Sequence, residues 1–213
     1  MNALQKLGVQ FNTDKSGIHN FNGRTFLDVY ERYFKYLKDS SISFLELGIY
    51  NGSSLKVWEN YFTNAQIVGL DIDPSKKQYQ TEKTKVYIGS QNDLNIINQI
   101  KNDYPNKFAV ILDDASHLND LTIDSFGLLF DHVVPGGLYI IEDTHCTYGG
   151  NTFESDAKHW PGMHYNNPDT NYKNDRQTFL NFILPKIKEL DSKTGNIFAI
   201  HFYSETLIIE KTK

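Results

Sequence analysis

The sequence of 213 residues lacks several features that mark particular classes of protein. It has a single cysteine, Cys146, so no internal disulfide can form, which is typical of proteins in a reducing compartment. No apolar run approaches the length of a membrane span, and the first ten residues contain no apolar stretch of a signal peptide. We therefore expect a cytoplasmic protein without a membrane partner.

The sequence also lacks any cluster of basic residues. Acidic residues outnumber basic ones by 26 to 21, which gives a net charge of -5. A protein that binds nucleic acid through its phosphates needs a basic surface, so we expect no nucleic-acid partner. No repeat, low-complexity tract or linker interrupts the chain, and a content of 39% hydrophobic residues is typical of globular proteins. The sequence therefore predicts a single domain over residues 1–213.

Short apolar strands alternate with amphipathic helices over most of the chain. Helices are expected at 24–38, 53–62 (capped by Ser53 or Ser54), 93–103 and 117–133, and strands at 42–47, 65–70, 85–89, 108–114 and 138–143. We expect Asp73 and Asp93 to cap the helical turns that follow them, and Pro135-Gly136-Gly137 to form a turn. Such alternation predicts right-handed βαβ units and a parallel sheet covered by helices on both faces.

The C-terminal part departs from this alternation. A helix bent at Pro185 is followed by two strands within residues 196–210, joined by a tight turn around Ser204 and Glu205. Strands joined so closely must be antiparallel. The sequence thus predicts an α/β fold with a Rossmann-like doubly wound sheet of five parallel strands and a C-terminal antiparallel hairpin. This combination resembles the class I S-adenosylmethionine-dependent methyltransferases.

Ligands of open α/β sheets bind at the carboxyl ends of the strands, so the residues there are candidates for a cofactor site. The loop after the first strand, Glu46 to Ser53, resembles methyltransferase motif I but lacks its middle glycine; a purely structural glycine turn is about as consistent with it. Asp71, at the next strand end, is placed to accept hydrogen bonds from ribose hydroxyls. The residues expected to contact S-adenosylmethionine are Glu46, Gly48, Gly52, Ser53, Asp71, Ser90, Gln91 and Asp113.

Acidic residues gather at the ends of the fourth and fifth strands. The fourth ends in Asp113-Asp114 with His117 nearby, and the fifth ends in Glu142-Asp143 with His145 nearby. Carboxylates brought together at neighbouring strand ends repel each other unless a cation lies between them. Magnesium or manganese prefers such oxygen ligands. We therefore favour a metal site over separate solvated carboxylates.

The sequence around these strand ends resembles a particular family. The run DDASHLNDLTIDSFGLLFDHVVPGGLYIIEDTH, with TDKSGIHNF and FLELGIYNGSSLKVWENYF upstream, is similar to the metal-dependent O-methyltransferases that act on the sugars of macrolides and related glycosides. The resemblance implies that Asp114, Glu142 and Asp143 bind the divalent cation. It also implies that His117 acts as the general base.

Two segments are expected to surround the acceptor. Residues 1–40 would form an N-terminal lid loop and helix, with Lys15 and His19 facing the site. Residues 144–174 form a polar insertion expected to act as a substrate loop. Its candidate substrate contacts are His145, Tyr148 and Trp160, where aromatic rings can pack against a sugar. Tyr148 and Trp160 are equally consistent with anchors of the loop, and His145 with a partner of the metal ligands or a loop histidine.

The sequence therefore predicts an enzyme that transfers a methyl group from S-adenosylmethionine to a hydroxyl of a sugar or glycoside, with magnesium or manganese. One alternative is a metal-dependent hydrolase or hydroxylase that uses the same carboxylates. Another is a non-catalytic Rossmann-like binding module. The identity of the sugar acceptor and the formation of a homo-oligomer are left open.

Overall fold

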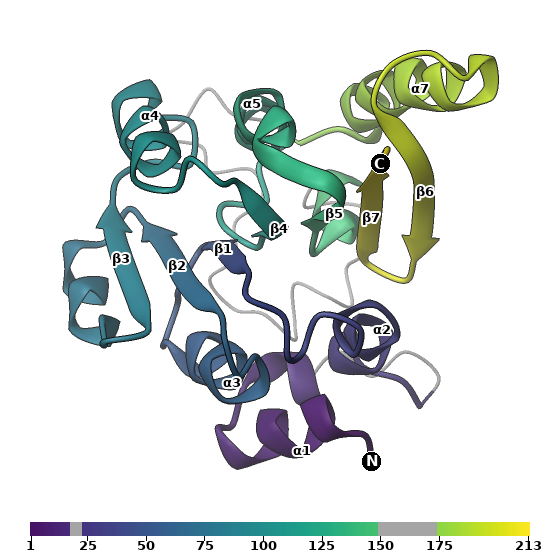
Figure 1. Cartoon of the computed structure of the whole chain (residues 1–213). Helices are drawn as coiled ribbons and strands as arrows, with labels where there is room; N and C mark the ends of the chain where they lie inside the picture. The colour runs from purple at the N-terminus through teal and green to yellow at the C-terminus, as the bar shows by residue number, and fades with distance from the viewer. Residues whose placement is uncertain (18–22, 149–173) are drawn as a thin grey trace.

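The computed structural model describes residues 1–17, 23–148 and 174–213, which form one twisted sheet between two layers of helices (Figure 1). The strands are β1 (Ser43–Leu47), β2 (Gln66–Asp71), β3 (Thr84–Ile88), β4 (Phe108–Asp113), β5 (Val133–Ile141), β6 (Ile197–Tyr203) and β7 (Thr206–Lys211). Their order in the sheet is β3-β2-β1-β4-β5-β7-β6. The first five are parallel, and β7 pairs antiparallel with both β5 and β6. The predicted fold class is confirmed.

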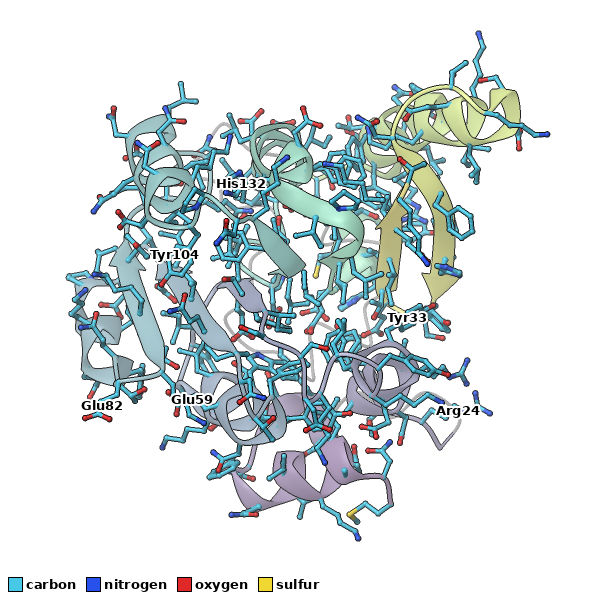
Figure 2. All side chains as sticks on the ribbon, in the orientation of Figure 1. Arg24, Tyr33, Glu59, Glu82, Tyr104 and His132 are labelled. Carbon is cyan, nitrogen blue, oxygen red and sulfur yellow. The ribbon has the colours of Figure 1, made fainter. Side chains whose placement is uncertain are left out.

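The helices form two layers whose side chains fill the space against the sheet (Figures 1 and 2). One layer contains α1 (Ala3–Gln10), α2 (Phe26–Phe34) and α3 (Ser53–Tyr61), and the other contains α4 (Leu94–Asp103), α5 (Asn119–Leu129) and α7 (Arg176–Ser192). Short 3-10 turns are η1 (Asp14–Ser16), η2 (Pro74–Tyr79), η3 (Phe130–His132) and η4 (Thr144–Tyr148). Over the residues described, no helix is long and apolar enough to cross a bilayer.

The N-terminal region contains more regular structure than predicted. No helix is expected before residue 24, yet α1 forms there, capped by Asn2, whose side chain accepts a hydrogen bond from the Gln5 amide. Its residues Leu4 and Leu7 pack on the core beside α2 and α3. Helix α2 is shorter than predicted and begins at a capping box between Thr25 and Asp28. The predicted lid loop is therefore reduced to the segment between α1 and α2.

The caps of the later helices are partly as predicted. Asp93 caps α4 and Asp73 caps η2, each through its side-chain oxygen, as expected. The predicted cap of α3 is wrong, because Gly52 occupies that position in a left-handed conformation with φ 73°. A glycine adopts this backbone without the steric penalty that a side chain would bring.

One break expected in regular structure does not occur. The predicted turn at Pro135-Gly136-Gly137 lies inside β5, where the pairing shifts from Phe108–Val133 to Val110–Leu138. The strand absorbs the extra residues as an irregularity, which is where proline is tolerated in a sheet. Pro185 lies inside α7, so the helix predicted to run through this proline is present.

Backbone hydrogen bonds hold the strand ends together beyond the strands themselves. The Asp114 amide donates to Leu47 at 2.9 Å, and the Glu142 amide donates to Asp113 at 3.0 Å. Gly48 has a φ of 89°, and a Cβ placed on it would overlap the carbonyl oxygen of Asp114. The loop after β1 can therefore approach the end of β4 only because residue 48 has no side chain.

We expect Gly48→Ala to lower the free energy of unfolding by about 2–4 kcal/mol, because the added methyl group meets backbone and the conformation is strained. Urea unfolding measures the change. Gly127→Ala is the matched control, since that position is helical and nothing lies within 4 Å of its added Cβ. The control should be neutral or slightly stabilising. Equal effects of the two substitutions would contradict the steric argument.

Candidate active site

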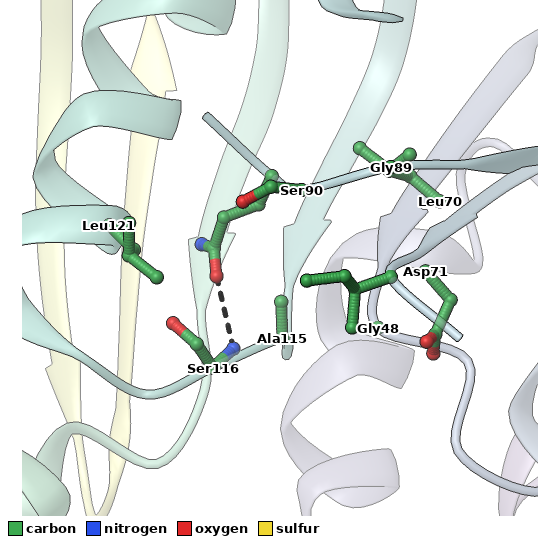
Figure 3. Close-up of a pocket in the computed structure, with 10 residues that line it drawn as sticks. Gly48, Leu70, Asp71, Gly89, Ser90, Ala115, Ser116 and Leu121 are labelled. Atoms are coloured by element: carbon green, nitrogen blue, oxygen red, sulfur yellow. Dashed lines mark hydrogen bonds between the residues drawn. The ribbon is translucent and has the colours of Figure 1, made fainter. Parts of the chain in front are cut away.

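A pocket opens at the carboxyl ends of β1, β2 and β3 (Figure 3). Its lining residues are Gly48, Leu70, Asp71, Ile72, Gly89, Ser90, Gln91, Ala115, Ser116 and Leu121. Four of the residues predicted for the cofactor, Gly48, Asp71, Ser90 and Gln91, thus lie around one cavity. Gly48 and Gly89 contribute backbone to the pocket wall, and Asp71 contributes the one acidic side chain. Apolar side chains form much of the remaining wall.

Asp71 connects the loops on two sides of this pocket. Its Oδ2 accepts a hydrogen bond from the Ile49 amide at 2.8 Å, and its Oδ1 accepts one from the Asp73 amide at 2.9 Å. A carboxylate has about four acceptor sites, so both oxygens can still accept from a ligand. Asp71 is therefore fixed in position with acceptor capacity to spare.

Asp113 does not reach the pocket, which corrects its predicted contact with the cofactor. Its carboxylate is buried and accepts hydrogen bonds from Ser125, Gln91 and Tyr139. Burial raises the pKa of Asp113 to about 6, against the opposing effect of these donors. Gln91 joins this network to the pocket, because its Oε1 accepts from the Ser116 amide at 3.1 Å (Figure 3). Asp113 therefore stabilises Gln91, which in turn holds the Ser116 backbone at the pocket wall.

Three other predicted cofactor contacts lie outside the pocket lining. Glu46 is fully buried, and its Oε2 accepts hydrogen bonds from Ser54 and from the Trp58 indole. Burial raises the pKa of Glu46 to about 8. Gly52 and Ser53 begin α3 and shape the turn into it. These three residues stabilise the loop after β1 and are not among the residues that line this pocket.

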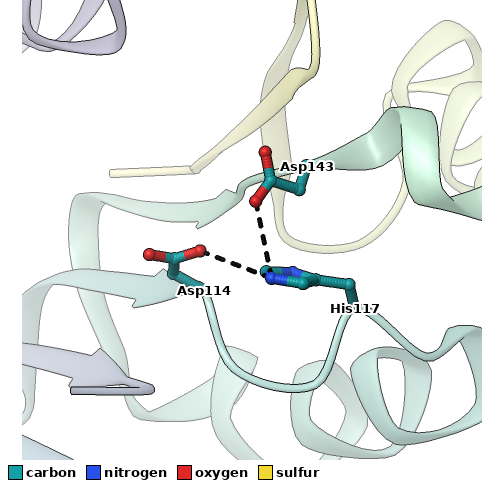
Figure 4. Close-up of side chains that lie close together, drawn as sticks. All are labelled: Asp114, His117 and Asp143. Carbon is teal, nitrogen blue, oxygen red and sulfur yellow. Dashed lines mark ion pairs between the residues drawn. The ribbon is translucent and has the colours of Figure 1, made fainter. Parts of the chain in front are cut away.

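Beside the pocket, the ends of β4 and β5 bring together Asp114, His117 and Asp143 (Figure 4). One ligand atom from each of the three lies within 4.8 Å of the other two. Nε2 of His117 is 3.4 Å from Oδ2 of Asp143 and 3.9 Å from Oδ1 of Asp114. The predicted clustering of acids with a histidine at these strand ends is therefore present in the structure.

The backbone is strained at two of these residues. His117 has a φ of 55° and Asp143 a φ of 53°, which is a left-handed conformation that residues with side chains rarely adopt. Such residues cost about 1–3 kcal/mol each and occur preferentially at functional sites. The structure uses them here to turn both side chains toward the same point (Figure 4).

Glu142 completes the acidic cluster from within the core. Only 3% of the residue is exposed, and its Oε1 accepts a hydrogen bond from the Tyr30 hydroxyl at 2.6 Å. Its Oε2 forms an ion pair with Nζ of Lys15 at 2.8 Å, and the same Nζ forms an ion pair with Asp114. The ammonium group therefore links two of the three predicted metal ligands.

Burial and mutual repulsion dominate the electrostatics of this cluster. Burial, the nearby Asp114 carboxylate and Asp143 together raise the pKa of Glu142 well above its usual value, against the effect of Lys15. Burial also raises the pKa of Asp114. Burial alone would lower the pKa of Lys15, but the carboxylates of Asp114 and Glu142 outweigh it and hold that pKa well above its ordinary value. A positive charge is thus strongly favoured at this point.

The residues predicted to contact the acceptor do not form one cluster, in contrast to the acidic residues at the strand ends. Lys15 is buried in the acidic cluster, where its ammonium group pairs with Asp114 and Glu142. His145 lies on η4, with Nδ1 3.4 Å from Oε2 of Glu205. Tyr148 is 41% exposed, and the Arg176 guanidinium lies 4.6 Å from its ring centre. His19 and Trp160 lie outside the described residues.

Two contributors to the site are absent from the sequence-based prediction. Asn174 donates hydrogen bonds to the carbonyls of His117 at 2.7 Å and Cys146 at 2.9 Å, and accepts one from the Asn119 amide. It therefore holds the strained loop of His117 against η4. Tyr30 lies within the helix expected at 24–38, and that expectation gives its hydroxyl no contact with the site. Nothing in a single sequence signals that either side chain reaches the strand ends from so far along the chain.

We expect Tyr30→Phe to lower the free energy of unfolding by about 1.5–3 kcal/mol, because a buried carboxylate oxygen loses a charge-assisted hydrogen bond. Tyr33→Phe is the matched control one turn along α2. The Tyr33 hydroxyl bonds to that of Tyr203 at 2.8 Å in a partly exposed position (Figure 2), so its loss should cost at most about 1 kcal/mol. Urea unfolding compares the two. A Tyr30→Phe protein as stable as the control would show that this bond contributes little.

Relatives of this chain are found by sequence. It is 32% identical over 167 residues to the mycinamicin VI 2''-O-methyltransferase of Micromonospora griseorubida, covering 75% of this chain and 38% of that protein. It is 33% identical over 145 residues to the demethylmacrocin O-methyltransferase of Streptomyces fradiae, covering 65% of this chain and 33% of that protein. No protein-family model matches the chain.

Solved structures extend the similarity to the whole chain. The MycE methyltransferase of the mycinamycin biosynthetic pathway, in complex with Mg and SAH, matches with a TM-score of 0.78 and 28% identity over 100% of this chain and 55% of that one. The same enzyme with Mg, SAH and mycinamycin VI matches with a TM-score of 0.76. The chain thus spans between 33% and 55% of the length of these relatives. By sequence and by fold, the chain is related to these O-methyltransferases and has the class I methyltransferase fold.

Proposed function

We propose that this chain transfers a methyl group from S-adenosylmethionine to a hydroxyl of a sugar or glycoside, with the help of a divalent cation. The observation that carries the proposal is the side-by-side position of two features at one edge of the sheet. A pocket with Gly48 and Asp71 on its wall lies next to the cluster of Asp114, His117 and Asp143. One relative with a matching fold, MycE, has been solved with both Mg and SAH.

The acidic cluster fits a hard divalent cation. Asp114, Glu142 and Asp143 offer carboxylate oxygens, the ligand type that magnesium and manganese prefer. A positive group, the Lys15 ammonium, already lies between two of these carboxylates. We propose Asp114, Glu142 and Asp143 as the residues that hold the metal.

The pocket fits an adenosine-bearing cofactor. Gly48 and Gly89 contribute bare backbone to the pocket wall, and their missing side chains let the Asp114 carbonyl and Ile96 pack against that wall. Asp71 has spare acceptor sites for ribose hydroxyls. Ser90, whose hydroxyl bonds to Asn92 at 2.8 Å, presents a further polar group at the rim. We propose Gly48, Asp71, Ser90 and Gln91 as cofactor contacts.

The chain's residues can supply the remaining chemistry. A divalent cation, when bound, makes a sugar hydroxyl more acidic and fixes its direction toward the methyl donor. His117 accepts the hydroxyl proton at Nε2, which faces the carboxylates. The oxygen then attacks the methyl carbon of the sulfonium donor, and the carbon–sulfur bond breaks to leave neutral S-adenosylhomocysteine.

The pocket also bears on the alternatives. A hydrolase or hydroxylase would need the acidic cluster but not the glycine-lined pocket beside it. A binding module would need the pocket but not two strained residues turned toward a cation site. The transferase uses both features.

The setting of the reaction is part of the proposal. We propose a glycosylated small molecule as the acceptor, since the curated relatives are named for such substrates. We also propose that residues 1–213 act as one catalytic domain in the cytoplasm, with residues 1–40 and 144–174 beside the acceptor; residues 149–173 lie outside the described part.

We expect Asp71→Ala to weaken the binding of S-adenosylhomocysteine about tenfold or more, because the ribose loses its acceptor and the Ile49 amide its partner. Calorimetry on the purified chain measures this. Asp73→Ala is the control, since Asp73 follows the same strand but caps η2 with its side chain. Unchanged affinity in Asp71→Ala, or tight binding of a nicotinamide dinucleotide instead, would contradict the assignment of the cofactor.

We expect His117→Ala to keep its affinity for cofactor and metal but to lose about two to four powers of ten in kcat, because a proton acceptor is removed. Asp114→Ala should lose metal binding and activity together, because it removes a ligand. S-adenosylhomocysteine formation with a panel of glycosides gives kcat, and calorimetry with manganese gives the metal affinity. His132→Ala, a histidine bonded to the Tyr104 carbonyl away from the site (Figure 2), is the control. Wild-type turnover in His117→Ala would remove His117 from the mechanism.

A further inference from the structure

The side chain of Lys15 occupies a position unusual for lysine. The residue is 2% exposed, and its ammonium group makes ion pairs with Asp114 Oδ2 and Glu142 Oε2. Lysine is almost never buried unless it is paired. Here the partners lie 99 and 127 residues further along the chain, so the contact is a product of the fold.

The same two oxygens belong to residues proposed above as metal ligands. A magnesium ion requires oxygens at about 2.0–2.1 Å, so an ion bound to both atoms would overlap the nitrogen between them. Glu142 cannot easily turn its other oxygen to the metal, because Oε1 accepts the Tyr30 hydroxyl at 2.6 Å. Ammonium and dication would also repel each other strongly where water does not screen them.

The backbone around Lys15 is anchored independently of this contact. The Gln5 side chain donates to the Ser16 carbonyl at 2.6 Å, and the Ser16 hydroxyl donates to the Thr13 carbonyl at 2.7 Å. The Lys15 amide donates to Asp14 at 2.9 Å. A four-carbon side chain with several rotamers can therefore move while η1 stays in place.

We propose that the Lys15 ammonium competes with the divalent cation for Asp114 Oδ2 and Glu142 Oε2, so that a cation bound by these two oxygens displaces the ammonium from them. This inference rests on the proposed function, because it takes Asp114 and Glu142 as metal ligands. Lys15 then lowers the affinity for the cation by competing with it. Its positive charge also balances the negative charges of the buried Asp114 and Glu142 carboxylates when no cation is bound to them.

The test compares manganese binding to the whole chain with and without the competing charge. Lys15→Met keeps the length and apolar stem of the side chain but removes the ammonium. We expect its dissociation constant for Mn²⁺, measured by calorimetry or by the electron paramagnetic resonance of free Mn²⁺, to fall about tenfold or more. Lys6→Met is the matched control, since Lys6 is exposed on α1 of the same N-terminal region and its loss changes the net charge equally.

A second variant guards against poor folding of the first. In Lys15→Gln, the melting temperature without metal should fall, and Mn²⁺ should raise it by more than it raises that of the wild type. Affinity in Lys15→Met equal to or weaker than that of the wild type would overturn the inference while leaving the metal site intact. Absence of Mn²⁺ binding in every protein, including the wild type, would overturn the metal-dependent function and, with it, the proposed competition between Lys15 and the cation.

Discussion

Carboxylates held at neighbouring strand ends repel one another unless a positive charge lies among them, and the site depends on that constraint. Parallel pairing of β4 with β5, continued by the hydrogen bond from the Glu142 amide to Asp113, fixes the spacing of Asp114, Glu142 and Asp143. The core then buries Glu142 almost completely. Removing such charges from water is costly unless they are paired. The fold therefore demands a cation at this point, whether an ammonium group or a metal ion.

Much of the surrounding structure serves to hold these groups in place. Tyr30 on α2 reaches the sheet edge to bind one oxygen of Glu142, and Asn174 holds the backbone of His117. His117 and Asp143 remain in strained conformations that their neighbours enforce. Gly48 lets the pocket loop come against the Asp114 carbonyl, so the pocket wall and the acidic cluster share a boundary. The proposed methyl transfer would require this closeness, because donor and acceptor must meet in line.

The sequence predicts the sheet and the acidic cluster well, because both depend on local patterns. Apolar strands that end in acids place those acids at one edge of a parallel sheet. Side chains alternate along a strand, so Asp113 and the adjacent Asp114 face opposite sides, and only one of the two can reach the acidic cluster. The same alternation places Glu46 against Trp58 instead of the pocket. These assignments could have been made from the sequence.

Other features depend on contacts that local patterns cannot reveal. Lys15 lies in a short polar segment typical of a loop, and only the packing of α1 and η1 brings it under the strand ends. The role of Asn174 likewise depends on which carbonyls the folded chain leaves beside it. Pro135-Gly136-Gly137 has the composition of a turn, but pairing with β4 keeps it within β5. In each case tertiary contacts decide the outcome over local propensity.

The most direct test of the account is methyl transfer by the whole chain with and without divalent cations. Formation of S-adenosylhomocysteine from S-adenosylmethionine would be followed with a panel of glycosides, first in EDTA and then after magnesium or manganese is restored. The account predicts that activity disappears in the chelator and returns with the metal, because the acidic cluster then regains the cation that activates the acceptor. Full activity in the chelator would contradict it.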